Sequence, residues 1–517
     1  MNTLIEKENN KRIAKNTIYM YLRMGVMLVI ALFTSRVNLK MLGVEDYGIY
    51  GVIGGVVSMF TIFSNSLSAA IQRFISFELG KGSKERLMNI FSMSETVMFS
   101  LAIILMICAD FFGIWFINNK MVIPAERIYA AHWVLHCSVI TFGISLVSVP
   151  YNAMIVAYER MSAFAYISIY EAVSKLIICY MLYISPVDRL ITWAVLLAIL
   201  QISVRLIYGF YCKRNFETCV FRLVFDKSLL IDITKYAGWS TFGLVALTCY
   251  TQGLNILLNI FFGPVVNAAR SISVQVQSAV QGFSTNFQVA MNPQIIKSYA
   301  QHDLHRMHSL IFTGSRFCFY LLFILSLPII LETPYILRIW LGEYPEHTVS
   351  FIRLILGIIT FDSSLGGPIS TAQTATGNIK IYQIVVGGIM LLILPVSYIV
   401  LRIWDTPPES IYYVYLSAVI IAHISRMFII RDMINLSLSL YAKEVLVPIT
   451  KVLFCSLPIP ILLHVYLDNA SFSSFVVVGV TSLVSVGLSV FLFGLNTDER
   501  KMIINKFRFL FRRYERH

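Results

Sequence analysis

Two arginines in apolar surroundings are the residues of this sequence whose chemistry most clearly requires a partner. Arg23 and Arg316 each lie about two helical turns inside an apolar stretch, with no acidic residue three or four positions away. A charge at the centre of a membrane-spanning helix costs at least ~2.5–3.5 kcal/mol, so such residues usually face a cavity. A guanidinium can hold phosphate through two parallel hydrogen bonds. We therefore expect Arg23 and Arg316 to line a water-filled chamber that receives an anion.

Two further basic residues have competing explanations. Arg36 lies close to the outer end of the first apolar stretch, where its side chain could instead reach the lipid headgroups. Lys175 follows Glu171 by four residues, which places both on one face of a helix, so an internal ion pair is as good an explanation as a ligand contact. Both Arg36 and Lys175 remain candidates for the cationic chamber.

An acidic residue and a group of amides suggest further features. Asp362 precedes the segment SSLGGP, where a helix should be broken or kinked. Its carboxylate could carry a coupling proton or cation, or it could pair with a buried arginine. The stretch around Pro293 is unusually polar, which predicts a helix that faces the chamber. Its amides are Asn286, Gln288, Asn292 and Gln294.

The sequence lacks the signatures of common enzymes. No GxxxxGK[ST] loop occurs, and Gly80-Lys81-Gly82 lacks the upstream glycine, so we expect no ATPase. His132 and His136 are spaced like two zinc ligands, but the glutamate of HExxH is missing, and we interpret them as core histidines. The eight cysteines show no CxxC pair. We therefore predict neither catalytic residues nor a metal or cofactor.

The composition defines the element type that must position these residues. Of 517 residues, 57% are hydrophobic and 13% charged, with a mean hydropathy of +0.74. Apolar runs of about 20 residues, the length of a membrane-spanning helix, recur throughout. We predict an all-α polytopic membrane protein with about fourteen transmembrane helices. Their expected ranges are 16–39, 48–71, 88–117, 128–157, 161–184, 190–211, 236–262, 271–295, 309–331, 348–375, 381–404, 410–430, 444–467 and 473–495.

The charge distribution predicts the orientation. The net charge of +13 could suggest a nucleic-acid partner, but most Lys and Arg residues lie in alternate loops, as the positive-inside rule requires. This pattern places both termini in the cytoplasm, and we expect no nucleic acid. The tail from Arg500 to His517 alternates basic and aromatic residues directly after an apolar stretch, so it should rest on anionic headgroups.

The landmarks of the first half return in the second. A shift of 220 residues places Gly43 on Gly263 and Arg86 on Arg306, each in the same order of apolar span, turn and basic loop. We interpret this order as two six-helix bundles related as parallel repeats. The predicted parts are an N-terminal bundle (1–211), a cytoplasmic amphipathic linker (212–235), a C-terminal bundle (236–431), two additional spans (432–495) and a basic cytoplasmic tail (496–517).

Two segments carry a resemblance to a known family. The run LGVEDYGIYGVIGGVVSMF…SLSAAIQRFISFELGKG, within 42–82, resembles the region of spans 1 and 2 in polysaccharide-biosynthesis flippases of the Wzx type. The segment ILRIWLGEYPE resembles their loop between spans 9 and 10. These flippases belong to the multidrug/oligosaccharidyl-lipid/polysaccharide (MOP) exporter superfamily and have a MATE-like fold.

The resemblance implies a function. Such proteins move undecaprenyl-diphosphate-linked oligosaccharides from the inner to the outer leaflet of the bacterial cytoplasmic membrane by alternating access through a cationic cavity. The products serve O-antigen, lipopolysaccharide, capsule or exopolysaccharide biosynthesis. The implied partners are the lipid-linked oligosaccharide, membrane lipids, and polymerase or other assembly proteins. The implied location is the inner membrane, which the chain would cross many times.

Three alternatives remain. MATE drug antiporters share the fold but have twelve spans and usually an acid in span 1, where this chain has Arg23 and Arg36; Asp362 keeps the antiporter open as an alternative. Lipid II flippases also have fourteen spans and an arginine in span 1. A membrane-embedded glycan polymerase or glycosyltransferase would need a sizeable outer loop, and the longest expected here is 332–347.

Overall fold

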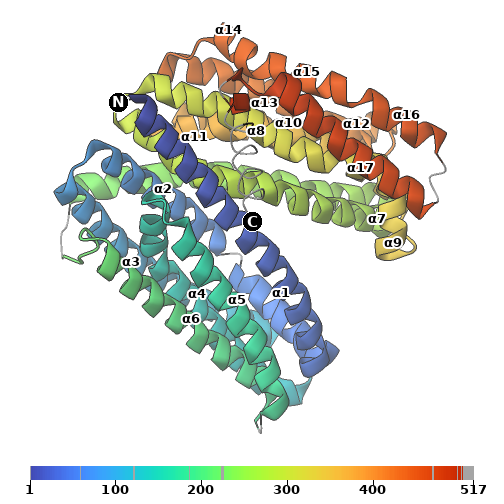
Figure 1. Ribbon diagram of the computed structural model, residues 1–517. Coiled ribbons are helices and arrows are strands. Elements are labelled where there is room, and N and C mark those ends of the chain that lie inside the picture. The colour runs from blue at the N-terminus through green and yellow to red at the C-terminus, as the bar shows by residue number, and fades with distance from the viewer. Residues whose placement is uncertain are drawn as a thin grey trace, which may run out of the picture. The chain divides into compact units, whose positions relative to one another are not determined.

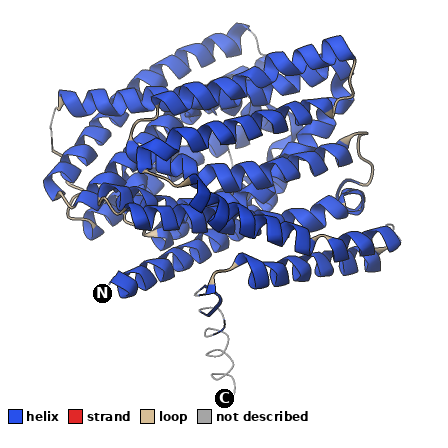
Figure 2. Cartoon of the chain, turned by 90° about the horizontal axis from the view of Figure 1, so that it is seen from above, coloured by secondary structure: helices blue, strands red, loops and turns tan. Residues whose placement is uncertain are grey.

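The described part of the chain is built from helices. The computed structural model describes residues 2–58, 60–119, 123–185, 187–222, 226–467, 471–497, 499–501 and 504. Within these ranges every regular element is a helix (Figure 2). The chain divides into two compact units, which are described separately: unit 1 comprises residues 1–245 and 289–303, and unit 2 comprises residues 246–288 and 304–517. The prediction of an all-α polytopic membrane protein is confirmed.

Eleven helical segments in the described ranges are long and apolar enough to cross a membrane. They are Lys84–Asn119, Ala125–Ala157, Met161–Ile184, Arg189–Asn215, Lys227–Gly263, Leu304–Leu331, Thr348–Thr376, Lys380–Trp404, Ser410–Ile434, Leu438–Tyr466 and Phe472–Gly494. Each coincides with one of the predicted spans. The three other predicted spans, 16–39, 48–71 and 271–295, also lie on helices, although the second is interrupted between Ser58 and Thr61.

Unit 1 is a bundle organised around one central helix (Figure 1). Its helices are α1 (Asn2–Ser58), α2 (Thr61–Lys81), α3 (Lys84–Asn119), the short η1 (Ala125–Arg127), α4 (Ile128–Ala157), α5 (Met161–Ile184) and α6 (Arg189–Asn215). The central helix α4 packs against α1, α2, α3 and α6, and more than half of its residues are buried. Its apolar side chains therefore form much of the core, as burial of apolar surface requires.

A glycine interrupts the longest helix of the chain. α7 (Lys227–Ala300) contains Gly263, whose φ of 80° and ψ of −173° lie in a region open essentially to glycine alone. The sequence predicted a turn at this residue, and the structure has a kink after which the helix resumes. The equivalent predicted turn at Gly43 falls within α1, which is helical from Asn2 to Ser58 and joins the predicted spans 16–39 and 48–71 without a loop. The predicted repeat and its domain boundaries stay predictions.

Unit 2 contains the middle of α7 and all later helices. They are α8 (Leu304–Leu331), α9 (Thr333–Leu341), α10 (Thr348–Phe361), η2 (Asp362–Gly366), α11 (Gly367–Thr376), α12 (Lys380–Trp404), α13 (Ser410–Ile434), α14 (Leu438–Tyr441), η3 (Ala442–Leu446), α15 (Val447–Ser456), α16 (Pro458–Tyr466), α17 (Phe472–Ser489) and η4 (Val490–Gly494). η2 is a π-helical turn, which is the break predicted at Asp362. α8 packs against both α15 and α17, so the C-terminal helices cover it.

Candidate functional site

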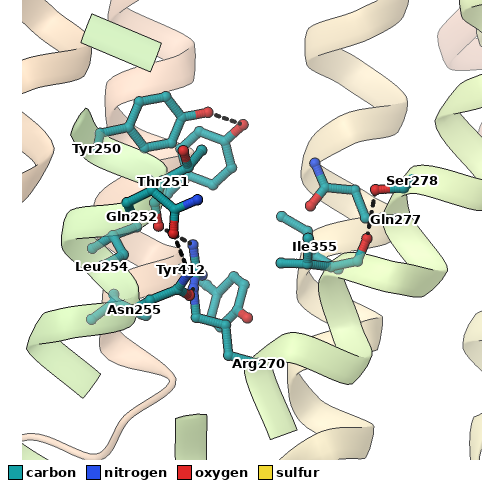
Figure 3. Close-up of a pocket in the computed structure, with 13 residues that line it drawn as sticks. Tyr250, Thr251, Gln252, Leu254, Asn255, Arg270, Gln277, Ser278, Ile355 and Tyr412 are labelled. Carbon is teal, nitrogen blue, oxygen red and sulfur yellow. Dashed lines mark hydrogen bonds between the residues drawn. The ribbon is translucent and has the colours of Figure 1, made fainter. Parts of the chain in front are cut away.

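A polar pocket of about 250 Å³ lies within unit 2, among α7, α10 and α13 (Figure 3). Its lining residues are Tyr250, Thr251, Gln252, Leu254, Asn255, Arg270, Val274, Gln277, Ser278, Ile355, Ile411, Tyr412 and Tyr415. The kink at Gly263 explains why two segments of one helix line the same pocket, since the helix changes direction between them. On the second segment, Arg270, Val274 and Ser278 follow a four-residue spacing, which places them on one helix face.

The positive charge of this pocket, which we name the Arg270 pocket, comes from a buried guanidinium. Arg270 is 5% exposed. Its Nε donates a 2.6 Å hydrogen bond to Oδ1 of Asn255, and its Nη2 donates to the carbonyl oxygen of Thr251 at 3.4 Å. The guanidinium carbon lies 5.9 Å from the centre of the Tyr412 ring. All these partners are neutral.

Arg270 differs in this respect from the other two buried arginines of unit 2. Arg316 and Arg426 each form an ion pair with a carboxylate, with N–O distances of 2.9 and 2.8 Å. Among the residues that the structure describes, no ion pair involves Arg270. Since an unneutralised charge inside a membrane protein is costly, such a residue is a candidate for binding an anionic ligand.

The other lining groups are neutral hydrogen-bonding groups and aromatic rings. The hydroxyl of Tyr250 donates to that of Tyr415 at 3.3 Å, and the hydroxyl of Tyr412 lies 3.1 Å from that of Ser273. Gln252 and Gln277 add amides from the two segments of α7, as Figure 3 shows. The pocket thus combines one fixed cation with hydroxyls, amides and aromatic faces. This arrangement can bind an anionic group that carries hydroxyls.

Arg316 is buried in unit 2 and bonded to an acidic residue, an amide and the backbone. Its side chain is 2% exposed, and its Nη2 is 2.9 Å from Oε1 of Glu499. Its Nη1 donates to Oδ1 of Asn496 at 2.9 Å and to the carbonyl oxygen of Gly494 at 3.5 Å. The sequence suggested no local partner, and the partner comes from a distant segment that follows η4. A role in anion binding would require this ion pair to open.

Arg23 is partly buried in unit 1. Its Nη1 lies 3.5 Å from Oγ of Ser168, and its guanidinium carbon lies 4.7 Å from the centre of the Phe164 ring. Both residues belong to α5, so the α5 side chains hold the guanidinium against that helix. The side chain of Arg36 lies outside those that the structure describes. A role for Arg23 or Arg36 in binding stays a prediction.

Two predicted charges have the acid–base partners that the sequence allowed. Lys175 Nζ donates to Oε1 of Glu171 at 2.6 Å, so the ion pair forms on α5. Asp362 accepts a hydrogen bond of 2.8 Å from Nη1 of Arg426, which is the second of the alternatives considered for this carboxylate. An ionic partner already fixed in place leaves the Asp362 carboxylate less available to a coupling cation.

The predicted amides fall in two places. Asn286 donates to the carbonyl oxygen of Gly282 at 2.8 Å, and Gln288 donates to that of Ser363 at 3.2 Å, both in unit 2. Asn292 belongs to the part of α7 in unit 1. Whether these amides face a common chamber stays a prediction.

The sequence interpretation missed Arg270 because it fell in the connection predicted between the spans 236–262 and 271–295. Basic residues in loops are expected at the membrane surface and not in a pocket. A detectable signal was available. Arg270, Gln277 and Ser278 share a helical face beyond Gly263, and polar residues also precede that glycine. Polar residues on both sides of a glycine kink can face one pocket.

Comparison with solved structures places this architecture among the MATE transporters. An outward-facing multidrug resistance MATE family transporter of the MOP superfamily aligns with a TM-score of 0.70 and 13% identity, over 84% of this chain and 97% of that one. A MOP superfamily transporter from Pyrococcus furiosus gives 0.69 and 13%, over 83% and 96%. MATE in its straight conformation gives 0.67 and 15%, over 84% and 97%. At these identities the similarity defines the fold, which is MATE-like.

The family follows from the sequence. The polysaccharide biosynthesis protein family matches residues 13–299, more than half of the chain. The chain belongs to this family, which confirms the resemblance seen in its first spans. A search of curated proteins finds no match.

Proposed function

We propose that this protein is a flippase that moves an undecaprenyl-diphosphate-linked oligosaccharide from the inner to the outer leaflet of the bacterial cytoplasmic membrane. Family membership supports a role in polysaccharide biosynthesis, and the MATE-like fold supports transport. The transported molecule would be a repeat unit of a surface polysaccharide. In the predicted orientation both termini are cytoplasmic.

The observation that carries this proposal is the buried charge of Arg270. A lipid diphosphate carries about two negative charges and must leave the headgroups for surroundings of lower dielectric, where an uncompensated charge is costly. Arg270 has no carboxylate partner in the described part of the chain, so its charge is available. One charge-assisted hydrogen bond contributes about 1.5–3 kcal/mol. Arg270 can therefore hold the diphosphate without first breaking an ion pair.

The predicted position of the Arg270 pocket also suits the release of the lipid into the outer leaflet. In the predicted orientation, the cytoplasmic loops 212–235 and 297–306 flank α7, so the kink at Gly263 lies toward the outer leaflet. Arg270 is seven residues beyond this kink, and Tyr412, which also lines the pocket, lies near the start of α13. We assign the Arg270 pocket to the outer-facing side of the transport path.

A cation-coupled drug antiporter is the main competing function. The positive charge of Arg270 would repel a cationic drug, and Asp362 is already paired with Arg426. The Pyrococcus furiosus transporter of the same superfamily is described as having a binding pocket of reversed polarity that suggests a different function. Pocket charge is thus a useful criterion for separating functions within this fold.

Transport in proteoliposomes tests the proposal. Purified protein is reconstituted with undecaprenyl-diphosphate-linked saccharide extracted from the source organism, and appearance in the outer leaflet is followed by enzymatic labelling of the sugar. We expect Arg270→Ala to reduce flipping about ten- to hundredfold. Arg270→Lys should restore only part, because an ammonium loses the fork geometry.

The control is Arg402→Ala, which removes an exposed arginine of α12 in the same unit. It should flip as fast as wild type. Equal rates for wild type and Arg270→Ala would remove the Arg270 pocket from the mechanism. Proton- or sodium-driven export of a cationic dye without any lipid flipping would favour the antiporter instead.

A further inference from the structure

A second polar pocket, of about 470 Å³, lies within unit 1 and has a different chemical character from the Arg270 pocket. This volume falls in the range of about 300–1,000 Å³ typical of small-molecule sites. Its lining residues come from α1, α2, α4, α5 and α6: Tyr50, Gly54, Val57, Thr61, Ser138, Thr141, Phe142, Ser145, Glu171, Lys175, Ala194, Leu197 and Gln201. We name it the Gln201 pocket.

The charges of the Gln201 pocket cancel. Glu171 and Lys175 form an ion pair at 2.6 Å, and their side chains are 29% and 42% exposed. Because the carboxylate and the ammonium lie side by side, an anion is repelled by the carboxylate and a cation is repelled by the ammonium. A neutral ligand avoids both repulsions, and its hydroxyls can donate to Glu171 and accept from Lys175 at the same time.

Two lining groups have open hydrogen-bonding capacity. Gln201 and Ser138 are partly buried, and neither has a hydrogen-bond partner among the described residues. An amide offers two donors and an acceptor, and a hydroxyl offers one donor and two acceptor sites. Polar groups enclosed in a bundle without partners are costly, so water or a ligand should complete them.

Two further hydroxyls are oriented as acceptors. Thr141 Oγ1 donates to the carbonyl oxygen of Cys137 at 2.8 Å, and Ser145 Oγ donates to that of Phe142 at 2.7 Å. Their donors are thus used within α4, while lone pairs on both oxygens remain for a ligand. The Gln201 pocket therefore presents alternating donors and acceptors over a short distance, as the hydroxyls of a sugar ring do.

An aromatic ring completes the lining. Tyr50 is held by an edge contact with the buried Trp193, with ring centroids 6.1 Å apart. Its ring gives the pocket an apolar surface against which the C–H face of a pyranose can pack, while the hydroxyls meet the polar side.

We propose that the Gln201 pocket binds an uncharged sugar residue of the transported saccharide and selects for it. This proposal rests on the proposed flippase function and divides recognition between two sites: Arg270 holds the diphosphate, and the Gln201 pocket reads the sugar. A polar pocket without net charge suits this second task, because it adds affinity only for a ligand with matching hydroxyls.

Binding of two lipids to the purified full-length protein, measured by native mass spectrometry, tests the division. The first lipid is undecaprenyl diphosphate, and the second is the saccharide-linked form extracted from the source organism. Wild type should bind the saccharide-linked lipid about five- to tenfold more tightly, as one or two net hydrogen bonds provide. Gln201→Leu should remove most of this preference and leave the affinity for undecaprenyl diphosphate unchanged.

Two further variants guard against a purely structural effect. Ser138→Ala removes a single hydroxyl and should also reduce the preference at least twofold, with an unchanged melting temperature. Gln72→Leu changes a partly buried glutamine of α2 outside the pocket and should keep the full preference. Arg270→Ala should weaken both lipids by the same factor.

The outcomes separate the two proposals. If Gln201→Leu and Ser138→Ala keep the wild-type preference, or if they weaken both lipids equally, the Gln201 pocket does not read the sugar, and the flippase proposal stands. If wild type binds both lipids equally, sugar recognition in this pocket is also wrong. If wild type binds neither lipid, the flippase proposal fails, and the sugar site fails with it.

Discussion

Lys297 donates a 2.6 Å hydrogen bond to Oε1 of Glu159, whose side chain is completely enclosed in unit 1. The second carboxylate oxygen of Glu159 accepts from Gln294 at 2.6 Å and lies 3.2 Å from Nε of Arg12. Glu159 itself occupies the turn between α4 and α5 with a φ of 58°. One carboxylate thus joins the start of α1, the α4–α5 turn and the last turns of α7.

Glu159→Gln should strongly destabilise unit 1. The substitution keeps the side-chain size but leaves the ammonium of Lys297, which is 18% exposed, without its nearest negative charge. Removing one partner of a buried ion pair costs on the order of 3–5 kcal/mol. Thermal unfolding of the purified protein in detergent should show a clearly lower melting temperature. The double variant Glu159→Gln/Lys297→Met should recover part of the loss, and an unchanged melting temperature in the single variant would contradict this role.

The pair of Glu159 and Lys297 also predicts that the stability of the fold changes with pH in the alkaline range. Burial lowers the pKa of Lys297 below the ordinary 10.5, and the attraction of Glu159 offsets only part of that effect. The folded protein therefore holds this proton less tightly than the unfolded chain does. From the lowered pKa up to 10.5, deprotonation of Lys297 increases the stability of the fold. The melting temperature of wild type minus that of Lys297→Met should rise between pH 7 and pH 10, and a constant or falling difference would contradict the lowered pKa.

Arg316 should be required for stability. Its side chain is buried and bonded to Glu499, Asn496 and the backbone at Gly494, so it ties α8 to the segment after η4. Arg316→Ala leaves Glu499 without its cation and opens a cavity in unit 2. We expect a lower melting temperature and less protein in the membrane on a blot. Arg23→Ala, in contrast, removes a long contact of 3.5 Å with the Ser168 hydroxyl and a contact with the Phe164 ring, and it should be inserted at normal levels. If Arg316→Ala protein is stable and present in normal amounts but fails to flip lipid, Arg316 acts in transport and not mainly in stability.

The comparison of Arg316 with Asp362 shows which features the sequence could predict. Glycine and π-helical breaks leave local signatures, so the kink at Gly263 and the turn at Asp362 were expected from nearby residues. Apolar length likewise predicts spans, because the bilayer thickness sets it. Ionic partners far apart in the chain leave no such signature: Arg316 and Glu499 are 183 positions apart. For this reason the sequence could predict which charged residues lie within the spans, but not which opposite charges pair with them.

The last prediction adds a carboxylate beside Arg270 without changing the size of the pocket. Asn255 accepts a 2.6 Å hydrogen bond from Arg270 Nε, so Asn255→Asp places a negative charge in the position of a neutral amide. The new ion pair resembles those of Arg316 and Arg426, and the pocket loses its net positive charge. Native mass spectrometry should then show binding of undecaprenyl diphosphate about ten- to hundredfold weaker, as for Arg270→Ala.

The same substitution should preserve the fold, which distinguishes loss of charge from loss of structure. A buried arginine that gains a carboxylate in hydrogen-bonding geometry is better compensated than one bonded to neutral groups. The substitution also removes the 3.0 Å hydrogen bond that Asn255 Nδ2 donates to Oε1 of Gln252, but the exposed Gln252 amide can rotate and donate to the new carboxylate, so the melting temperature should stay equal or rise. Asn378→Asp makes the same charge change at an exposed position of unit 2 and should bind the lipid normally. If Asn255→Asp also bound undecaprenyl diphosphate normally, the free charge of Arg270 would not be what holds the diphosphate, because its guanidinium would then be neutralised in place.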